Sequence, residues 1–202
     1  MRCFRKPAQG KLSGMKPLIL ASGSPRRREL LARLGIAFDV RPVNIDESPQ
    51  PGERAEGLAA RLALAKARTA VKAYPACRVL GADTVVAQAE RILGKPADAH
   101  EAQRWLATLS GREHRVVTAL ALIDGAGVSQ VSVVTRVWFK TLAAEEIARY
   151  VRTSEPLGAA GAYAVQGGAA GFVARLVGSY TNVVGLPLAA LAEMLSRAEA
   201  GV

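Results

Sequence analysis

Apolar and polar positions follow two distinct patterns along the chain, and together they predict a mixed α/β fold. Short apolar or alternating runs, typical of strands, predict strands at residues 17–21, 37–43, 78–86, 114–123, 131–140, 161–166 and 171–177. Amphipathic stretches predict helices at residues 24–34, 53–73, 98–109, 143–152 and 187–197. The order of these elements predicts a mixed sheet with flanking helices, bent around a cleft.

Capping residues support two of the predicted helices. Ser24 is a favourable N-cap, Pro25 fits the first helical position, and Gly35 is placed to end the helix. Asp98 and Glu101 have the spacing of a capping pair at the start of another helix.

The composition is that of a globular protein with a sizeable core. Half of the 202 residues are hydrophobic, which excludes an intrinsically disordered chain. The longest apolar runs fall short of the roughly 20 residues that span a bilayer. Cys3 and Cys77 are too few for a disulfide scaffold, and no cysteine cluster accompanies the two histidines, which excludes a zinc finger. We therefore expect a reduced, cytoplasmic protein. The histidines, both interpreted as lying near charged surface residues, give little support for histidine-based catalysis.

Basic residues exceed acidic ones by 10, because 27 Lys and Arg stand against 17 Asp and Glu. Residues 1–14 carry four of these basic residues, no acid and one aromatic, so we interpret them as a disordered basic extension before a single domain at 15–202. A nucleic-acid-binding arm is the disfavoured alternative. The remaining positive charge could serve nucleic acid or a polyphosphate substrate held in one cleft.

The segment SGSPRRR, at residues 22–28, has the features of an anion site. It lies between a predicted strand and a helix start, where free backbone N–H groups favour a negative group. Ser22 offers a hydroxyl, and Arg26 and Arg27 can each form paired hydrogen bonds to phosphate oxygens. The segment matches neither a Walker A loop nor GxGxxG. The alternative is an ordinary helix cap with solvated arginines.

Two acids are candidates for metal binding and water activation. Asp83 interrupts an apolar strand, which is unfavourable unless the strand opens to a site, and Glu47 lies in a loop. Two carboxylates that converge near phosphates would hold Mg²⁺ or Mn²⁺, and one could activate water. The alternatives are a structural Asp83 paired with an arginine and a solvent-facing Glu47.

Further candidates are two lysines and two amides. Lys95, between Gly and Pro, could reach a phosphate, and Lys66 lies in the long predicted helix, where a surface lysine is the alternative. Gln166 belongs to a glycine-rich stretch that could approach a base. Asn182 could contact a ligand, but capping of the last helix is the preferred interpretation.

In combination, these segments resemble the Maf family of nucleoside triphosphate pyrophosphatases from about Pro17 to Leu195. The ordered set of motifs is what makes the resemblance specific. In chain order the motifs are LASGSPRRRELL, NIDE, LALAKA, GADTVV, LGKP, LSGREH, EIARYV, AGAYAVQG and GSYTNVVGLPL.

The resemblance implies a two-lobed α/β fold related to the inosine triphosphate pyrophosphatases, with the site in the cleft and a divalent metal as cofactor. It implies that Asp83 accepts a proton from water and that Glu47 and Asp83 hold the metal. The residues implied to bind the triphosphate are Ser22, Arg27, Lys66 and Lys95. The residues implied to set base specificity are Arg26, Thr84 and Gln166.

The three base-specificity positions also imply a subfamily. Trp, Gln and Glu there would resemble the 7-methyl-GTP branch, whereas Arg26, Thr84 and Gln166 resemble the dTTP/UTP branch. A Gln amide offers both the donor and the acceptor that a pyrimidine edge needs. The chain departs from the family where Gly158-Ala159 replaces a pair ending in Lys, and where Ala65 replaces a Glu.

The function expected from the resemblance is hydrolysis of dTTP and UTP to the monophosphate and pyrophosphate. One alternative is the same reaction on 7-methyl-GTP or modified nucleotides. Another is a non-catalytic regulator of cell division that binds nucleotides or nucleic acid. The expected partners are the nucleotide substrate and a second copy in a homodimer, with no membrane.

Overall fold

A central sheet of mixed direction organises the computed structural model, which describes residues 16–125 and 127–200. Within these residues seven strands form one sheet in the order β2-β1-β3-β5-β6-β7, with β4 paired to β3 off this path. The strands are β1 (Leu18–Leu20), β2 (Phe38–Val40), β3 (Arg78–Gln88), β4 (Arg91–Leu93), β5 (Glu113–Asp124), β6 (Gly127–Phe139) and β7 (Val173–Val177). β1 runs parallel to β2 and β3, and the remaining pairs are antiparallel.

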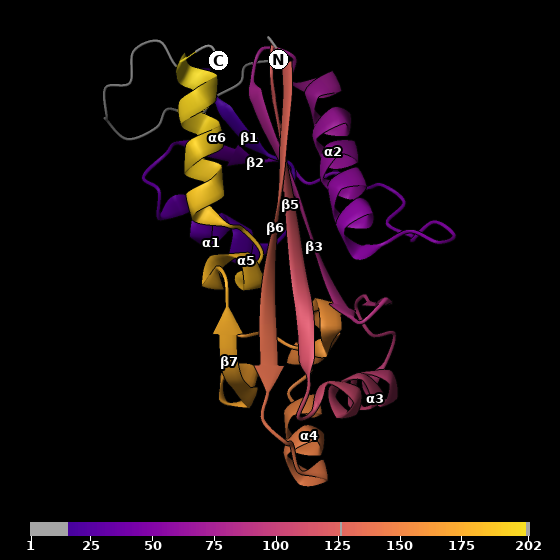
Figure 1. Cartoon of the computed structure of the whole chain (residues 1–202). Helices are drawn as coiled ribbons and strands as arrows, with labels where there is room; N and C mark the ends of the chain where they lie inside the picture. Colours follow the sequence, from indigo (N-terminus) through magenta and orange to yellow (C-terminus); the bar gives the residue numbers. More distant parts are fainter. Residues whose placement is uncertain (1–15, 126, 201–202) are drawn as a thin grey trace.

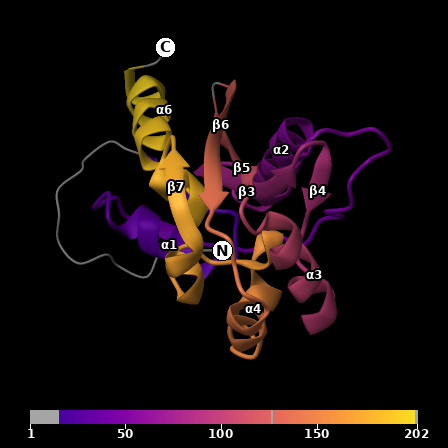
Figure 2. The same cartoon turned by 60° about the horizontal axis from the view of Figure 1, so that its bottom comes forward.

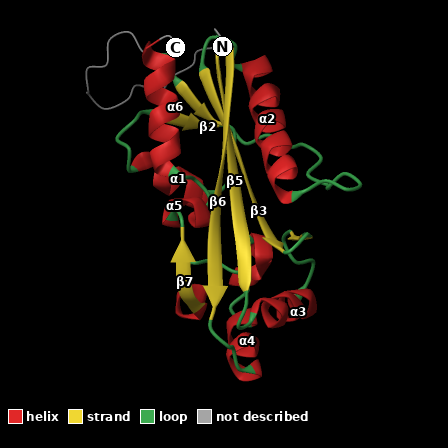
Figure 3. Cartoon of the chain, viewed as in Figure 1, coloured by secondary structure: helices red, strands yellow, loops and turns green. Residues whose placement is uncertain are grey.

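Helices cover both faces of the sheet (Figure 1; Figure 3). The α-helices are α1 (Pro25–Ala32), α2 (Ala55–Ala73), α3 (Ala99–Leu109), α4 (Ala144–Val151), α5 (Tyr180–Val184) and α6 (Leu188–Ala200). The 3₁₀ turns are η1 (Glu155–Gly158), η2 (Ala160–Ala162) and η3 (Gly168–Phe172). No helix among the described residues is both long and apolar enough to cross a membrane.

The long strands β3, β5 and β6 join two lobes (Figure 1). The upper lobe holds β1, β2, α1, α2 and α6, and the lower lobe holds α3, α4 and β7. Figure 2 brings the lower lobe forward and shows α3 and α4 there. This arrangement confirms the predicted mixed α/β sheet with flanking helices.

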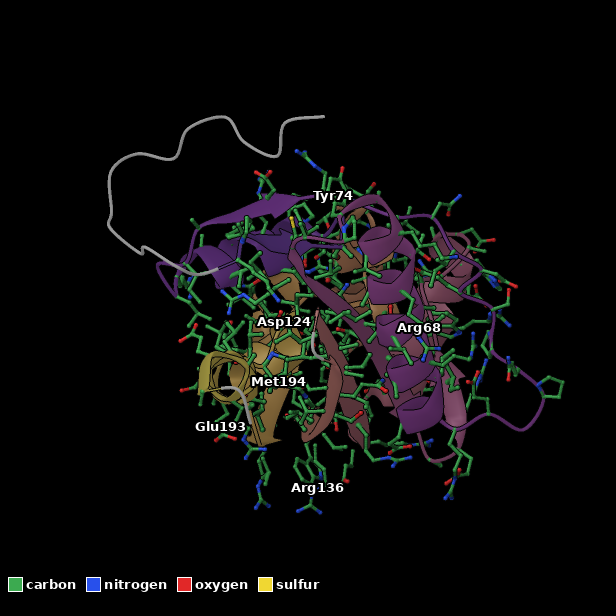
Figure 4. All side chains as sticks on the ribbon, turned by 90° about the horizontal axis from the view of Figure 1, so that it is seen from above. Arg68, Tyr74, Asp124, Arg136, Glu193 and Met194 are labelled. Atoms are coloured by element: carbon green, nitrogen blue, oxygen red, sulfur yellow. The ribbon has the colours of Figure 1, made fainter. Side chains whose placement is uncertain are left out.

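The two sheet faces bury different kinds of side chain. On one face, the small side chains of α2, such as Ala59, Ala63 and Ala67, pack against β3 and β5. On the other face, larger side chains such as Leu30, Leu120 and Leu191 join α1, α6 and the lower lobe in a second cluster. Figure 4 shows this layering from above, with α2 and α6 on opposite sides and Arg136 pointing away from the molecule. The alanines bring α2 close to the sheet, and this closeness matters at the site.

The predicted caps are present. The Ser24 hydroxyl accepts a hydrogen bond from the Arg27 N–H, and the Asp98 carboxylate accepts one from the Glu101 N–H. Gly35 takes the positive φ that ends the first helical segment.

The prediction of a strand at residues 161–166 is wrong. The other predicted strands are present, and their first and last residues differ from the predicted ones. Gly161 has φ of 69° and Ala162 has φ of 60°, so the backbone is left-handed where a strand must be extended. A short helix, α5, lies just before α6, where no helix was predicted. The basic extension predicted at residues 1–14 lies outside the described residues.

Candidate active site

A cavity of about 870 Å³ opens where one edge of β3 has no neighbouring strand. β1 pairs with β3 at Arg78–Leu80 and β4 pairs with it at Val86–Gln88, so among the described residues no strand covers that edge at residues 81–85. Successive side chains of a strand point to opposite faces. Because the edge is open, Asp83 and Thr84 both line the cavity although they belong to opposite faces.

An ion-paired triad lies on the α2 side of this cavity. Lys66 of α2 places its Nζ 2.6 Å from the Asp83 Oδ1 and 2.6 Å from the Glu47 Oε1. The Lys66 and Asp83 side chains are about nine-tenths buried, whereas the Glu47 side chain is half exposed. The two predicted metal-binding acids therefore meet around one ammonium group, and Lys66 is not the surface residue of the alternative interpretation.

Electrostatics keep Glu47 ionised. Partial burial opposes its charged form, but the hydrogen bond and charge of Lys66, with the charges of Lys95 and Arg27, hold the pKa of Glu47 below its usual range. Glu47 can therefore offer negatively charged oxygens to a cation at neutral pH.

Cationic and hydroxyl groups line the cavity beside these acids. Ser22 is buried at the end of the β1 segment, Lys95 is exposed on the loop after β4, and both line the cavity. The start of α1 contributes Ser24 and Pro25 to the lining, and the Ser24 hydroxyl there already accepts from the Arg27 N–H. This set of donors and positive charges is suited to an anionic ligand with several phosphates.

Arg27 is buried at the junction of these groups. Its Nε donates to the Gly185 carbonyl at 2.9 Å, Nη1 to the Ser22 hydroxyl at 3.1 Å and Nη2 to the Thr84 hydroxyl at 2.9 Å. Burial lowers the pKa of Arg27, while Asp83 and Glu47 oppose that shift. An arginine carries five N–H donors, so two remain for a phosphate after these three bonds. The contribution of Arg27 to triphosphate binding stays a prediction. Its three hydrogen bonds also give it a positioning role.

The three positions expected to set base specificity all line the same cavity. Thr84 lies on β3, Gln166 is exposed on the loop before η3, and Arg26 projects from α1 toward the lower lobe. The Arg26 Nη2 donates to the Gly158 carbonyl at 3.3 Å, at the position where the chain departs from the family pattern. The structure thus brings Arg26, Thr84 and Gln166 together in one space.

A tyrosine and a glutamate hold the loop that carries Gln166. The Tyr150 hydroxyl donates to the Glu155 carboxylate at 2.7 Å and accepts from the Ala164 N–H at 3.0 Å. The other Glu155 oxygen accepts from the Gly168 N–H at 3.3 Å. Both ends of the loop are therefore fixed to α4 and η1. This role of Tyr150 and Glu155 was not predicted from the sequence, because neither residue belongs to a local motif.

The structure corrects the interpretation of Asn182 and of one histidine. Ser179, not Asn182, caps the neighbouring helix, and the Asn182 side chain is fully buried against β5 and β6. His114 is 1% exposed rather than near surface charge, and its Nε2 lies 2.8 Å from the Tyr163 hydroxyl. Burial lowers the pKa of His114 to about 4, so the ring is neutral at physiological pH.

The donor set fits a hard divalent cation completed by substrate. Glu47 and Asp83 supply two carboxylates, and the described residues contain no group of three or more His, Cys, Asp or Glu placed to hold a metal ion. Mg²⁺ is commonly held by one or two carboxylates together with water and substrate phosphates. A metal bound here would therefore depend on the nucleotide for part of its coordination.

Comparison with known proteins shows a family that the chain matches. A family model described as "Maf-like protein" matches residues 17–198. A protein of Pelotomaculum thermopropionicum is 50% identical over 91% of this chain and 97% of its own length. A protein of Myxococcus xanthus is 50% identical over 90% and 92%, and one of Escherichia coli O157:H7 is 49% identical over 90% and 93%. All three carry the name dTTP/UTP pyrophosphatase.

Proposed function

The chain belongs to the Maf-like protein family, and on this premise we propose that it hydrolyses dTTP and UTP to the monophosphate and pyrophosphate. The observation that carries the proposal is the Asp83–Lys66–Glu47 triad inside a cavity lined by further cations. A carboxylate beside cationic groups is placed to accept a proton from a water molecule that attacks a phosphoryl group.

Binding of the triphosphate is assigned to the hydroxyl and cationic groups of the cavity. The Ser22 hydroxyl accepts from Arg27 and keeps its own hydrogen for a phosphate oxygen, and Lys66, Lys95 and Arg27 supply positive charge. These groups disperse the charge that develops on the leaving pyrophosphate.

Asp83 is the proposed general base. Its carboxylate accepts the proton of the water whose oxygen attacks the α-phosphorus, and the α–β bridging bond breaks to release pyrophosphate. Lys66 holds Asp83 in place through their 2.6 Å contact. Glu47 and Asp83 would hold Mg²⁺ or Mn²⁺, which supplies charge neutralisation at the phosphates when bound.

Arg26, Thr84 and Gln166 are proposed to select the base. They lie in the same cavity as the triad, at the α1, β3 and lower-lobe sides. The place of action that follows from these substrates is the cytoplasm, which holds the nucleotide pool.

The test is release of pyrophosphate from a panel of nucleoside triphosphates, with Mg²⁺, with Mn²⁺ and with EDTA. The panel includes dTTP, UTP and 7-methyl-GTP, and it is run on the wild type and on Asp83→Asn. We expect metal-dependent release from dTTP and UTP, at least 1000-fold slower in Asp83→Asn with nucleotide binding largely retained.

Three results would contradict parts of the proposal. Full activity of Asp83→Asn would refute the assignment of the base. Release from 7-methyl-GTP instead would refute the assignment of specificity. Absence of pyrophosphate release from every nucleotide of the panel would favour a substrate outside the panel or the non-catalytic binder.

A further inference from the structure

The Thr84 hydroxyl is an inner member of a largely buried chain of hydrogen bonds. Its Oγ1 is 2.9 Å from the Arg27 Nη2 on one side and 2.9 Å from the Thr118 Oγ1 on the other. Thr118 is directly opposite Thr84 in the β3–β5 register and is fully buried. The Thr118 Oγ1 in turn lies 2.9 Å from the Asn182 carbonyl oxygen. Four residues far apart in sequence thus form one connected relay, which we call the threonine relay: Arg27, Thr84, Thr118 and Asn182.

The orientation of Asn182 is fixed by its surroundings. Its Oδ1 accepts from the Thr118 backbone N–H at 3.1 Å, and its Nδ2 donates to the Val116 carbonyl at 3.0 Å and to the Thr135 hydroxyl at 2.9 Å. A backbone N–H can only donate and a carbonyl can only accept, so the amide cannot be reversed. Asn182 is therefore a rigid anchor for Thr118 through both its side chain and its main chain.

The anchor determines the direction of every hydrogen bond in the relay. A hydroxyl has one hydrogen, and that of Thr118 goes to the Asn182 carbonyl, which can only accept. Between the two threonines, Thr84 must therefore donate to Thr118. Arg27 has only donors, so Thr84 accepts from it. The single hydroxyl hydrogen of Thr84 therefore points to Thr118. One lone pair of the Thr84 oxygen remains to accept a hydrogen bond from a ligand in the cavity.

From this we infer that the threonine relay makes Thr84 a fixed hydrogen-bond acceptor and thereby selects bases that carry a ring N–H. The inference rests on the proposed function, with Thr84 at the base. Uracil and thymine present a ring N–H at N3, whereas the N3 of cytosine carries no hydrogen and would face a second acceptor. Thr118 and Asn182 are then positioning residues that determine specificity without touching the substrate.

Gln166 cannot make this distinction by itself. Its amide has both donors and an acceptor, and it lies exposed on a loop, so rotation lets it satisfy either base. A group whose hydrogen is fixed by buried partners has no such freedom. Rejection of a mismatched base is therefore assigned to Thr84, because an acceptor that meets another acceptor loses a hydrogen bond in a partly desolvated site.

The experiment compares uracil with cytosine in two ways. The kcat/KM values for UTP and CTP give one ratio, and the Kd values of the α,β-imido analogues of UTP and CTP, measured by calorimetry, give a second ratio that needs no turnover. The variants are Thr118→Val, which removes the acceptor for Thr84, Thr118→Ser, which keeps it, and Thr135→Val. Thr135→Val breaks the same network at Asn182 without touching Thr84, so it is the matched control for lost stability.

We expect Thr118→Val to reduce the uracil preference about tenfold or more, because the freed Thr84 hydrogen can turn to the N3 of cytosine. Thr118→Ser and Thr135→Val should keep the wild-type ratio. Thermal unfolding of all three variants checks that they fold.

The results that would overturn the inference differ from the result that would overturn the proposed function. An unchanged preference in folded Thr118→Val, or equal binding of the two analogues by the wild type, would overturn it. An equal loss of preference in Thr135→Val would also overturn it, because the effect would then be one of stability. A wild type that binds but does not turn over UTP would overturn the proposed function and leave the binding ratios to decide the inference.

Discussion

Replacement of Gly81 by alanine probes the close contact that positions the triad. Gly81 lies on β3, two residues before Asp83, under the helix α2 that carries Lys66. A Cβ at this position would lie 2.1 Å from the Ala63 carbonyl oxygen and 2.8 Å from the Ala67 nitrogen. Both contacts are with helix backbone, so no side-chain rotation can relieve them.

The magnitude follows from these distances. An ordinary contact begins at 3.4 Å, so α2 must move by about 1.3 Å to accept the methyl group. Overpacking of a dense core typically costs about 1–3 kcal/mol, and a clash with rigid backbone belongs at the upper end. For a chain of this length about 3 kcal/mol corresponds to a fall in Tm of about 6–12 °C. The same shift moves Lys66 relative to Asp83, and a misplacement of about 1 Å can reduce kcat about 100-fold.

The assay is thermal and urea unfolding followed by circular dichroism, with pyrophosphate release measured on the same samples. Gly57→Ala is the matched control, because Gly57 is an exposed position of the same helix whose Cβ would meet only the Glu53 Cγ at 3.7 Å. Alanine there should stabilise the protein by about 0.5–1 kcal/mol. Replacement of glycine by alanine is therefore expected to lower the stability at position 81 and to raise it at position 57.

The reasoning would be refuted by Gly81→Ala with a Tm within about 2 °C of the wild type. It would also be refuted if the two alanine variants lost stability equally, because the loss would then reflect the chemistry of the substitution rather than the contact with α2.

Two further predictions concern the lower lobe. The pKa of His114 is about 4 in the folded protein against 6.5 in the unfolded chain, so the unfolded state binds the extra proton, and about 3 kcal/mol of stability should disappear as pH falls from 6.5 to 4. Urea unfolding should show this loss in the wild type, and a slope equally steep in His114→Phe would contradict it. Tyr150→Phe frees the loop that carries Gln166, so KM for UTP should rise about tenfold with a smaller change in kcat, and an unchanged KM would argue against that role of Tyr150.

The arrangement of local elements could be predicted from the sequence. The apolar runs and amphipathic periods depend only on neighbours in the chain, and so do the caps at Ser24 and Asp98, so each carries its own signal. The segment SGSPRRR after β1, the candidate anion site, and the unusual Asp83 within an apolar strand were visible for the same reason. The left-handed backbone at Gly161 and Ala162 was not visible, because apolar composition resembles that of a strand.

The roles of the implied site residues came from the resemblance, and the structure tests only their proximity. It brings Ser22, Arg27, Lys66, Lys95, Glu47, Asp83, Arg26, Thr84 and Gln166 to one cavity. The metal, the homodimer and the individual catalytic roles stay predictions.

Only the tertiary structure decided how the charges and hydroxyls are partnered. The sequence by itself determined the elements and placed Asp83 and Thr84 side by side on a strand whose two faces should separate them. The uncovered edge of β3 lets both reach one cavity, and that gap depends on where β1 and β4 end. Thr84 meets Thr118 across 34 residues, and Arg27 meets Gly185 across 158. Such contacts leave no trace in local periodicity, because the sequence pattern records which face is buried but not which distant group lies against it.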